Sequence, residues 1–251
     1  KYLTYVSPFF ENKPSAIIVF DESQAYDNIL VQISKIYKIK SITLQHGLYI
    51  DKGFSDINYS NLISNIFLCW GKNTELLIKK YNKNIKTHIC GKPSLVFEKN
   101  KPSNFRYVSL IFDQNCYQEE NKKILKIISN YCFENKISLN VRFHPHNIIS
   151  DYEFDEKLTL FKNMSIINSI FVVGHSSSLL YECYSKGIKT LKFKSIHKNI
   201  VFPPKQQFKN LDQLKKGIEH FNFDIEFIKE YISFSEKNSI KRFRDFFKKE
   251  L

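Results

Sequence analysis

The sequence contains no long hydrophobic run. Its uninterrupted apolar stretches, such as residues 16–20, are about five residues long, whereas a membrane-spanning helix needs about 20. We therefore expect no transmembrane helix. Hydrophobic residues make up 43% of the 251 residues and charged residues 25%, which is typical of a folded globular protein and argues against disorder.

Cysteine is present, but never as a closely spaced pair. The five cysteines lie at least 16 positions apart and form no C-x-x-C motif. This spacing excludes a conventional zinc site and a disulfide framework, so we expect no metal centre. Several cysteines stand among apolar residues, as Cys69 does, which is typical of reduced cysteines in a protein core. The pattern favours a cytoplasmic location.

The sequence also lacks the motifs of several common enzyme classes. It contains neither G-x-G-x-x-G nor G-x-x-x-x-G-K-[ST], which argues against dinucleotide-binding proteins and P-loop proteins. It contains no G-x-S-x-G and no H-E-x-x-H motif. No Asp-x-Asp follows a predicted strand, so the sequence gives no sign of a metal ion held against a diphosphate. We expect chemistry that needs neither a cofactor nor a metal ion.

Positive charge is in excess, yet arginine is scarce. Lysine and arginine number 38 against 25 acidic residues, but only four of the 38 are arginine. An excess of this size points to an anionic partner. Lysine recognises bases and phosphates less specifically than arginine, and the charge is spread along the whole chain. We expect no nucleic acid and favour a phosphorylated small molecule or an anionic membrane surface; a basic nucleic-acid-binding protein is the non-enzymatic alternative.

Short strand-like runs alternate with helical patterns along the chain. Residues 16–20 form a buried strand by length and branching, residues 26–37 carry apolar side chains at helical spacing, and residues 41–44 form the next strand. This alternation predicts right-handed crossovers and parallel sheets. The proline-containing stretch 91–105 indicates a linker, after which the alternation restarts.

We therefore predict an α/β protein of two Rossmann-like halves whose parallel sheets face a central cleft. The first half is an acceptor-side domain of residues 1–95. The second is a nucleotide-donor-binding domain of residues 96–251, including the C-terminal helices. The N-terminal half is short and the chain does not begin with Met, so we expect part of that domain, such as a first strand, to be missing or reduced.

Polar clusters follow four predicted strands, and ligands bind at the carboxyl ends of strands in sheets of this kind. Three of the four clusters contain histidine. They are Asp21-Glu22, Gln45-His46-Gly47, His144-Pro145-His146 and Gly174-His175-Ser176-Ser177-Ser178.

The last two clusters suit a phosphate. Gly174 permits a tight turn, and a serine after it is a good N-cap for the helix that follows, whose free amides would receive a phosphate. Pro145 fixes the backbone after His144, whose imidazole would donate to a phosphate oxygen. Glu182, one turn into the helix, is placed to accept from ribose hydroxyls.

The first two clusters suit a general base. His46, beside Gly47, is one candidate to take a proton from an acceptor hydroxyl. Asp21 and Glu22 are the rival candidates, and the sequence leaves the choice open.

Taken in order, these motifs resemble those of a known group of enzymes. The residues that carry the resemblance are Gln45-His46-Gly47, Trp70-Gly71, Gly91-Lys92-Pro93, Arg142-Phe143-His144-Pro145, and Ser176-Ser177-Ser178 with Glu182 and Gly187. The set spans roughly residues 41–193. It resembles bacterial surface-polysaccharide transferases of the GT-B fold, which include capsule Kdo transferases, sialyltransferases, polysialyltransferases and teichoic-acid glycerophosphotransferases.

The resemblance implies roles for individual residues. In these enzymes a His-Pro motif and a Ser-Ser motif hold the nucleotide of the donor, which assigns that role to His144, Ser176 and Ser177. Likeness to the teichoic-acid enzymes implies that His46 is the base. The run 21–23 resembles the acid-acid-glycine motif of sialyltransferases, except that Ser23 replaces glycine.

We therefore expect a metal-independent glycosyltransferase that moves a sugar from a nucleotide donor to a bacterial surface glycan, such as a capsule or lipopolysaccharide chain or its lipid-linked precursor. A CMP-sugar is the favoured donor, with CDP- and UDP-linked sugars as alternatives. A non-hydrolysing nucleotide-sugar epimerase is the competing enzyme class. It would need carboxylates as acid and base, for which Asp21, Glu22 and Glu182 are the candidates.

The C-terminal residues 236–251 combine a Phe-rich face with a basic face. Such a helix can lie on anionic lipid, so we predict weak, salt-sensitive association with the inner face of the cell membrane. The alternative is that the Phe-rich face packs on the protein and leaves the lysines in water.

Overall fold

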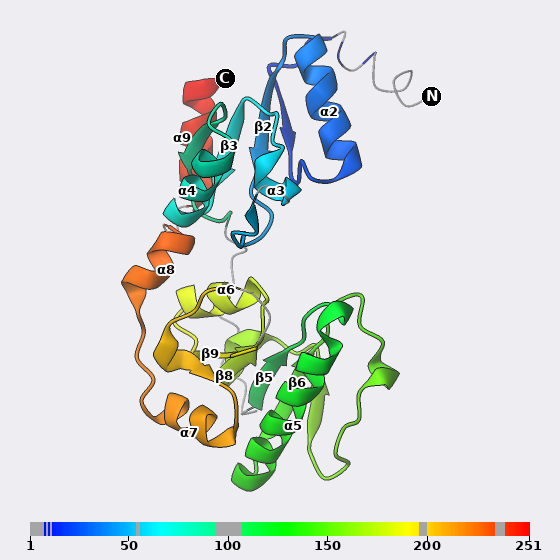
Figure 1. Ribbon diagram of the computed structural model, residues 1–251, viewed down its shortest axis with the longest axis vertical. Helices are drawn as coiled ribbons and strands as arrows, with labels where there is room; N and C mark the ends of the chain where they lie inside the picture. The colour runs from blue at the N-terminus through cyan, green and yellow to red at the C-terminus, as the bar shows by residue number, and fades with distance from the viewer. Residues whose placement is uncertain are drawn as a thin grey trace. The chain divides into compact units, whose positions relative to one another are not determined.

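The chain folds into two compact α/β units, each built on one parallel sheet (Figure 1). The first unit comprises residues 1–95 and 229–251, and the second comprises residues 96–228. The computed structural model describes Pro8, Phe10 and residues 12–53, 56–93, 107–195, 200–233 and 239–251. The predicted linker 91–105 therefore lies mostly outside the described residues.

The first unit has a four-stranded sheet in the order β1-β2-β3-β4, with every neighbouring pair parallel. Because all four strands run parallel, their carboxyl ends lie at one edge of the sheet. The strands are β1 (Ala16–Val19), β2 (Lys40–Leu44), β3 (Ile66–Cys69) and β4 (Lys86–Ile89). The helices are α2 (Ala25–Ile36), α3 (Ile57–Ser60), α4 (Lys72–Tyr81) and α9 (Ser239–Glu250).

The second unit has a six-stranded parallel sheet in the order β10-β9-β8-β5-β6-β7. Its strands are β5 (Tyr107–Ile111), β6 (Ser138–Arg142), β7 (Leu160–Lys162), β8 (Ser169–Gly174), β9 (Thr190–Phe193) and β10 (Gln207–Phe208). Its α-helices are α5 (Gln118–Asn135), α6 (Leu179–Ser185) and α7 (Leu211–Glu219), while α8 (Ile225–Tyr231) spans the division between the units. Its short 3₁₀ helices are η2 (Asn115–Tyr117), η3 (Ile149–Asp151), η4 (Ile166–Asn168) and η5 (Pro204–Gln206).

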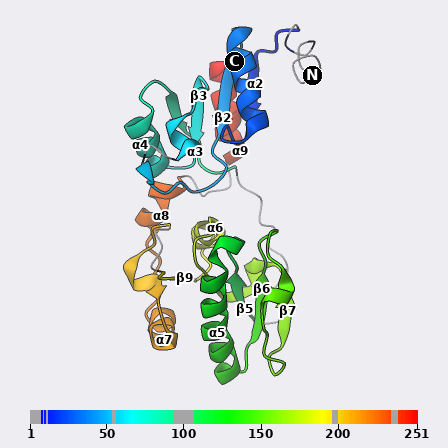
Figure 2. The same cartoon turned by 45° about the vertical axis from the view of Figure 1, so that its right-hand side comes forward.

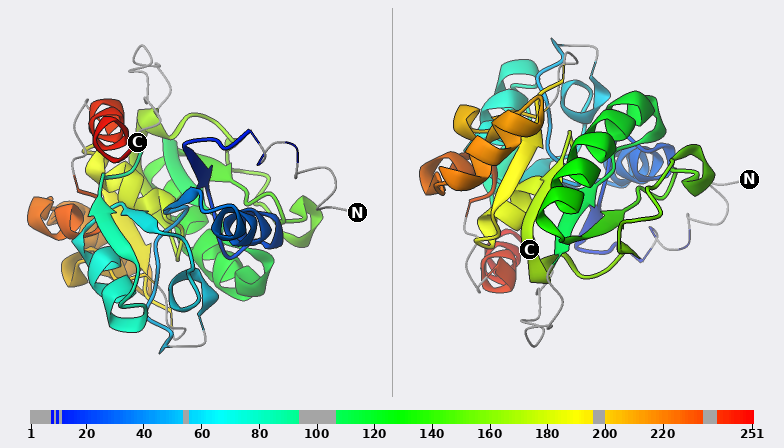
Figure 3. Two further views of the ribbon diagram at one scale, coloured as in Figure 1. Left: turned by 90° about the horizontal axis from the view of Figure 1, so that it is seen from above. Right: turned by 90° about the horizontal axis from the view of Figure 1, so that it is seen from below.

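The main core of the second unit lies between its sheet and helix α5 (Figure 2). Alternate residues of β5, such as Val108 and Leu110, pack against Ile124 and Ile128 of α5, and all four side chains are fully buried. Helix α7 adds Leu214 to the same core and lies beside α5 (Figure 3). All five residues of β5 are buried, Ser109 included, because both faces of this central strand are covered.

Helix α9 packs on the sheet of the first unit (red in Figure 1). Phe246 is 5% exposed and contacts Ile42, Ile66 and Leu68, and the rings of Phe243 and Phe247 pack around it. The predicted second domain of residues 96–251 is therefore wrong at its C-terminal end. The reason is that the Phe-rich face covers an apolar sheet surface, and each buried aromatic ring contributes about 1.5–3 kcal/mol.

For residues 236–251, of which 236–238 lie outside the described residues, the packing agrees with the alternative in which the Phe-rich face lies on the protein. The Phe-rich face of α9 is therefore not available to lipid, and membrane association through its basic face stays a prediction. Throughout the described part of the chain, no helix is both long and apolar enough to cross a bilayer.

Two glycines leave space for the backbone of the segment that returns to the first unit. A side chain at Gly71 would collide with the backbone of Tyr231, and a side chain at Gly91 would collide with the carbonyl oxygen of Ser233. Gly91 also has φ +77°, a conformation that other residues rarely adopt. The amide of Ser233 donates to the carbonyl oxygen of Trp70 at 2.9 Å. Two motifs used for the family resemblance therefore have a structural reason in this fold.

Candidate functional site

The loops after β1 and β2 bring Asp21 and His46 together. Nδ1 of His46 lies 3.3 Å from Oδ1 of Asp21 and 3.2 Å from the hydroxyl of Tyr49. The side chains of His46 and Asp21 are 30% and 13% exposed. Both polar neighbours lie on the Nδ1 side, and within the described residues no hydrogen bond engages Nε2. The ring can therefore exchange a proton through Nε2 while Asp21 holds the other nitrogen.

Local hydrogen bonds fix the Asp21 carboxylate. Its Oδ1 accepts from the amide of Ser23 at 3.0 Å and from the Ser23 hydroxyl at 2.6 Å. Burial, with the charge of Asp21 as a second cause, raises the pKa of Tyr49 well above its ordinary range, so Tyr49 stays a neutral phenol. Ser23, which replaces the glycine of the sialyltransferase motif, thus orients the carboxylate of Asp21.

Glu22 points into the protein and is only 3% exposed. Its carboxylate accepts from the hydroxyl of Thr43 at 2.9 Å and from the amides of Ile63 and Ser64. These bonds tie the loop before β3 to the strand β2 beside it. The geometry favours a structural role for Glu22 and leaves Asp21 as the accessible carboxylate of the pair.

Gln45 holds the His46 loop in place. It is 1% exposed, its Oε1 accepts from the amide of Trp70 at 2.6 Å, and its Nε2 donates to the carbonyl oxygen of Gly47 at 2.7 Å. Because one buried side chain joins both sides of His46 to strand β3, the imidazole is presented from a rigid loop.

In the second unit, polar residues follow three adjacent strands in the order β8-β5-β6. His144 follows β6, the serine cluster 176–178 follows β8, and Asp113 follows β5. The last of these was not predicted from the sequence, because a short acidic turn after a strand is common. Parallel topology brings all of these residues to one edge of the sheet.

A tight turn fixes the ring of His144. The amide of Asn147 donates to the carbonyl oxygen of His144 at 2.9 Å, with Pro145 in the turn, and the amide of His146 donates to Nδ1 of His144 at 3.2 Å. Since Nδ1 accepts a hydrogen bond, the neutral ring carries its proton on Nε2. The side chain of Asn147 donates to the carbonyl oxygen of Asp113 at 3.0 Å and so joins the two loops. His144 is therefore a positioned donor.

The serine cluster begins helix α6 as expected, but Ser177 is the serine whose side chain caps it. Its hydroxyl accepts from the amide of Leu179 at 3.3 Å, whereas Ser178 makes no side-chain cap. No hydrogen bond within the described residues engages the hydroxyls of Ser176 or Ser178, and all three serines are half-buried. A side chain at Gly174 would lie 3.1 Å from the carbonyl oxygen of Ile111, so the strand exit is tight.

Two buried ionisable residues lie under this edge. His175 is fully buried, and its Nδ1 is 3.5 Å from Oδ2 of Asp113. Glu182 is 9% exposed, in the first turn of α6, so most of its surface is covered by protein. The structure thus places Glu182 close in sequence and space to the serine cluster, while His175 supports the loop from inside.

Lys192 is a further buried cation at this edge, and it belongs to none of the polar clusters predicted from the sequence. It is 3% exposed and pairs in register with Gly174 on the neighbouring strand. Its Nζ is 3.4 Å from the carbonyl oxygen of Phe193, which is a long hydrogen bond. Burial, with the nearby charge of Lys194, lowers the pKa of Lys192 to about 8. Strict alternation along β9 could have drawn attention to it, because lysine stands there between Leu191 and Phe193.

Among the described residues, no group of three or more His, Cys, Asp or Glu side chains is arranged to hold a metal ion. The polar residues instead form two sets, one on each unit. Asp21 and His46 form a paired acid and base on the first, whereas the second offers neutral donors and a buried lysine.

Comparison with known sequences gives one weak relative. No family model matches the chain. The uncharacterized protein MJ1060 of Methanocaldococcus jannaschii is 26% identical over 228 residues, which cover 83% of this chain and 41% of that protein. The chain thus spans about two fifths of the length of this curated relative.

Comparison with solved structures gives similar folds at low sequence identity. A UDP-GlcNAc 2-epimerase of Methanocaldococcus jannaschii has a TM-score of 0.65 at 13% identity, over 98% of this chain and 80% of that one. The pneumococcal O-GlcNAc transferase GtfA has a TM-score of 0.63 at 9% identity, over 99% and 60%. A UDP-GlcNAc 2-epimerase of Neisseria meningitidis has a TM-score of 0.59 at 14% identity, over 98% and 80%. The predicted α/β fold of the GT-B type, with two parallel sheets, is confirmed.

Proposed function

We propose that the protein is a metal-independent glycosyltransferase, which moves a sugar from a nucleotide-activated donor to a hydroxyl group of a glycan. The observation that carries the proposal is the pairing of His46 with Asp21 at the carboxyl edge of the first sheet. A partly exposed imidazole with a carboxylate at its far nitrogen is suited to accept a proton from an alcohol. The sequence left His46 and Asp21 as rivals; in the proposal they act as a pair.

The base activates the acceptor. Asp21 holds the proton on Nδ1 of His46 and stabilises the imidazolium that forms when Nε2 takes the proton of the acceptor hydroxyl. The acceptor oxygen then forms a bond to the anomeric carbon of the donor sugar. The bond between that carbon and the donor phosphate oxygen breaks, and its electron pair leaves with the phosphate. Glu22 and Gln45 act as positioning residues through the loops that they hold.

The second unit binds the donor and stabilises the leaving phosphate. His144 donates from Nε2, and the free hydroxyls of Ser176 and Ser178 add neutral donors. Lys192 supplies the positive charge, since a phosphate nearby favours its protonated form. Glu182 would accept from the ribose hydroxyls, while Pro145, Gly174 and Ser177 shape the two loops.

The sequence resemblance and the structural neighbours support different donors. The resemblance to sialyltransferases and Kdo transferases favours a CMP-sugar. The neighbours named for UDP-GlcNAc and for O-GlcNAc transfer make a UDP-sugar the first alternative, followed by a CDP-linked donor. We propose a bacterial surface glycan or its lipid-linked precursor as acceptor, handled in the cytoplasm. The exposed lysines 248 and 249 of α9 would then meet anionic lipid at the inner face of the membrane.

A thermal-shift screen with CMP, CDP, UDP and GDP tests the proposal. A ligand at about 100 times its Kd adds about 2.7 kcal/mol, which raises Tm by several degrees. We expect one nucleotide to give this shift, the double variant His144→Gln/Ser176→Ala to lose it, and His46→Gln to keep it. The last variant is the control, because it changes the other unit. If no nucleotide or nucleotide sugar shifts Tm, the proposal is wrong.

The likeness of the fold to two UDP-GlcNAc 2-epimerases supports an epimerase as a second candidate. Such a reaction needs an accessible acid and base, and of the candidates Asp21, Glu22 and Glu182 only Asp21 is accessible. Glu22 is buried with both oxygens engaged, and Glu182 is 9% exposed. Incubation with UDP-GlcNAc, followed by analysis for the 2-epimer, distinguishes the two reactions.

A further inference from the structure

A lysine-rich pocket of about 490 Å³ lies at the amino edge of the first sheet. Lys40 begins β2 and Lys86 begins β4, while Lys35 and Lys38 come from the end of α2 and the turn after it. This edge is opposite the one that carries His46, because the strands are parallel. The pocket therefore belongs to the first unit alone and is separate from the candidate catalytic residues.

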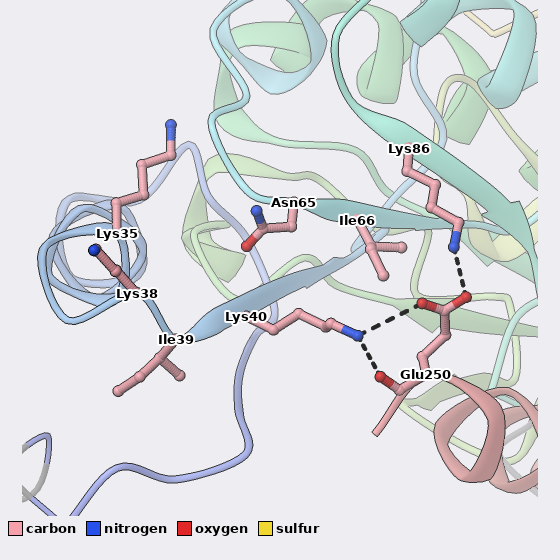
Figure 4. Close-up of a pocket in the computed structure, with 8 residues that line it drawn as sticks. All are labelled: Lys35, Lys38, Ile39, Lys40, Asn65, Ile66, Lys86 and Glu250. Carbon is pink, nitrogen blue, oxygen red and sulfur yellow. Dashed lines mark hydrogen bonds and ion pairs between the residues drawn. The ribbon is translucent and has the colours of Figure 1, made fainter.

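Figure 4 shows two sides of this pocket, with Asn65 between them. On one side, Glu250 of α9 pairs with Nζ of Lys86 at 2.6 Å and with Nζ of Lys40 at 3.7 Å. The ion pair with Lys86 lowers the pKa of Glu250, so this carboxylate stays charged. Lys40 and Lys86 thus have a structural role, because their ion pairs with Glu250 hold the end of α9 against the sheet.

Lys35 and Lys38, on the other side of the pocket, have no such structural role. Lys35 and Lys38 are exposed, and neither forms an ion pair with any described residue. Lys38 has φ 54°, a left-handed conformation that asparagine or glycine adopts more readily than lysine. One carboxylate faces four lysines, which leaves a surplus of three positive charges at one pocket.

We propose that this pocket binds a phosphate-bearing anion. An ammonium group is a point-charge donor that suits phosphate, and long flexible lysines can close on a ligand from two sides. Asn65 adds a fixed neutral donor. Its Oδ1 accepts from the amide and the hydroxyl of Ser41 at 2.8 and 3.0 Å, so its Nδ2 group is left to donate to the ligand. The ligand is a free polyphosphate or the phosphate of a lipid headgroup, which share this chemistry.

The test compares two double variants that remove the same charge. Lys35→Gln/Lys38→Asn removes the two uncommitted lysines, with glutamine suited to a helix and asparagine to a left-handed residue. Lys13→Asn/Lys241→Gln is the control, since Lys13 has φ 46° and Lys241 is exposed on α9. Neither variant touches the salt bridges of Glu250, so both are expected to fold.

Pyrophosphate binding is measured by calorimetry at low salt, and vesicle binding is measured by flotation with phosphatidylglycerol or phosphatidylcholine. We expect the pocket variant to bind one of the two anionic probes about tenfold more weakly than wild type, and the control variant to stay within about twofold. Loss of pyrophosphate binding identifies a free phosphate ligand. Loss of binding to phosphatidylglycerol alone identifies a lipid headgroup.

Two results would overturn the proposal. One is equal binding of both probes by wild type and pocket variant, and the other is an equal loss in the pocket and control variants, which would indicate general charge attraction. Pyrophosphate bound at the second unit would persist in the pocket variant. The nucleotide-induced Tm shift is measured in parallel and should be the same in all three proteins, so failure here is distinct from failure of the proposed transferase.

Discussion

At the scale of single residues, the structure distinguishes side chains that neighbour one another in sequence. Asp21 and Glu22 are adjacent acids, yet one faces His46 at 3.3 Å and the other is 3% exposed among amides and a hydroxyl. The serine cluster divides in the same way, because Ser177 caps α6, whereas the hydroxyls of Ser176 and Ser178 form no hydrogen bond with the part of the chain that the structure describes. Polar residues at a strand end therefore do not share one role, and burial decides which of them can meet a ligand.

The pair of Asp21 and His46 gives the first prediction. His46→Gln should lower kcat about 10²–10⁴-fold, because the base that accepts the proton is lost. Asp21→Asn should lower kcat at least about tenfold, since an amide cannot stabilise the imidazolium. Initial rates of sugar transfer measure both effects.

Ser23→Ala is the matched control. It removes one hydrogen bond to Asp21 and leaves both reacting groups, so a loss of only a few-fold is expected. Nucleotide-induced Tm shifts should be unchanged in all three variants. If His46→Gln retained the wild-type rate across the pH range, His46 would not be the base.

Lys192 gives the second prediction, at the same scale. Its pKa is about 8 in the folded protein, below its ordinary value of 10.5. Between these values the unfolded chain holds a proton that the folded chain has released, so the free energy of unfolding should rise with pH from 8 to 10.5. Lys192→Met should remove this rise and add about 1–3 kcal/mol of stability at pH 7, where the buried charge is costly.

The same variant should weaken nucleotide binding, because the charge that meets the phosphate is lost. Urea unfolding at several pH values, together with calorimetric titration, measures both properties. The exposed Lys194 offers the control Lys194→Met, which leaves the buried charge in place. If Lys192 has no role in ligand binding, Lys192→Met should raise the stability and leave the nucleotide affinity unchanged.

At the scale of secondary-structure elements, an amphipathic pattern defines a face but not its partner. The spacing of phenylalanines in α9 predicts one apolar face correctly, and the sheet of the first unit covers it. Helix α6 has only seven residues. The position of its N-terminus is therefore set mainly by the turn after Gly174. The buried residues of strands β5 and β8 are apolar except for Ser109, because both strands are covered on both faces.

The packing of α9 gives a third prediction. Phe246→Ala should destabilise the first unit by about 3–5 kcal/mol, because the ring is 5% exposed and its removal leaves a cavity. Ile240→Ala on the same helix is the control, since Ile240 is 72% exposed and should change stability by less than about 0.5 kcal/mol. Thermal unfolding followed by circular dichroism measures the difference; equal effects would mean that α9 does not pack as described.

At the scale of the whole molecule, parallel sheets give each unit two chemically different edges. In the first unit the carboxyl edge holds His46 and Asp21, whereas the amino edge holds the lysine pocket. Residues 229–251 complete this unit, and Gly71 and Gly91 provide the room that the returning segment needs. Elements far apart in sequence thus complete one sheet and one pocket.

Sequence periodicity alone determined the fold class. Apolar runs like residues 16–20, each followed by a helical pattern, recur through the chain. The β-branched side chains and the spacing of apolar residues are sufficient to predict a strand or an amphipathic helix. The predicted strands also showed that the polar clusters lie at strand ends. Because parallel strands end at the same edge of a sheet, these clusters were expected to lie near one another. His46, His144 and the serines 176–178 could be selected in this way.

Tertiary structure decided what depends on contacts between distant residues. Only the fold shows that Asp21 meets His46, that Glu22 turns inward, and that Lys192 is buried beside Gly174. The position of α9 and the pocket around Glu250 likewise depend on a surface formed by strands about 200 residues away. Sequence patterns record local preference, whereas burial and charge pairing follow from long-range packing, and those two properties select the residues able to do chemistry.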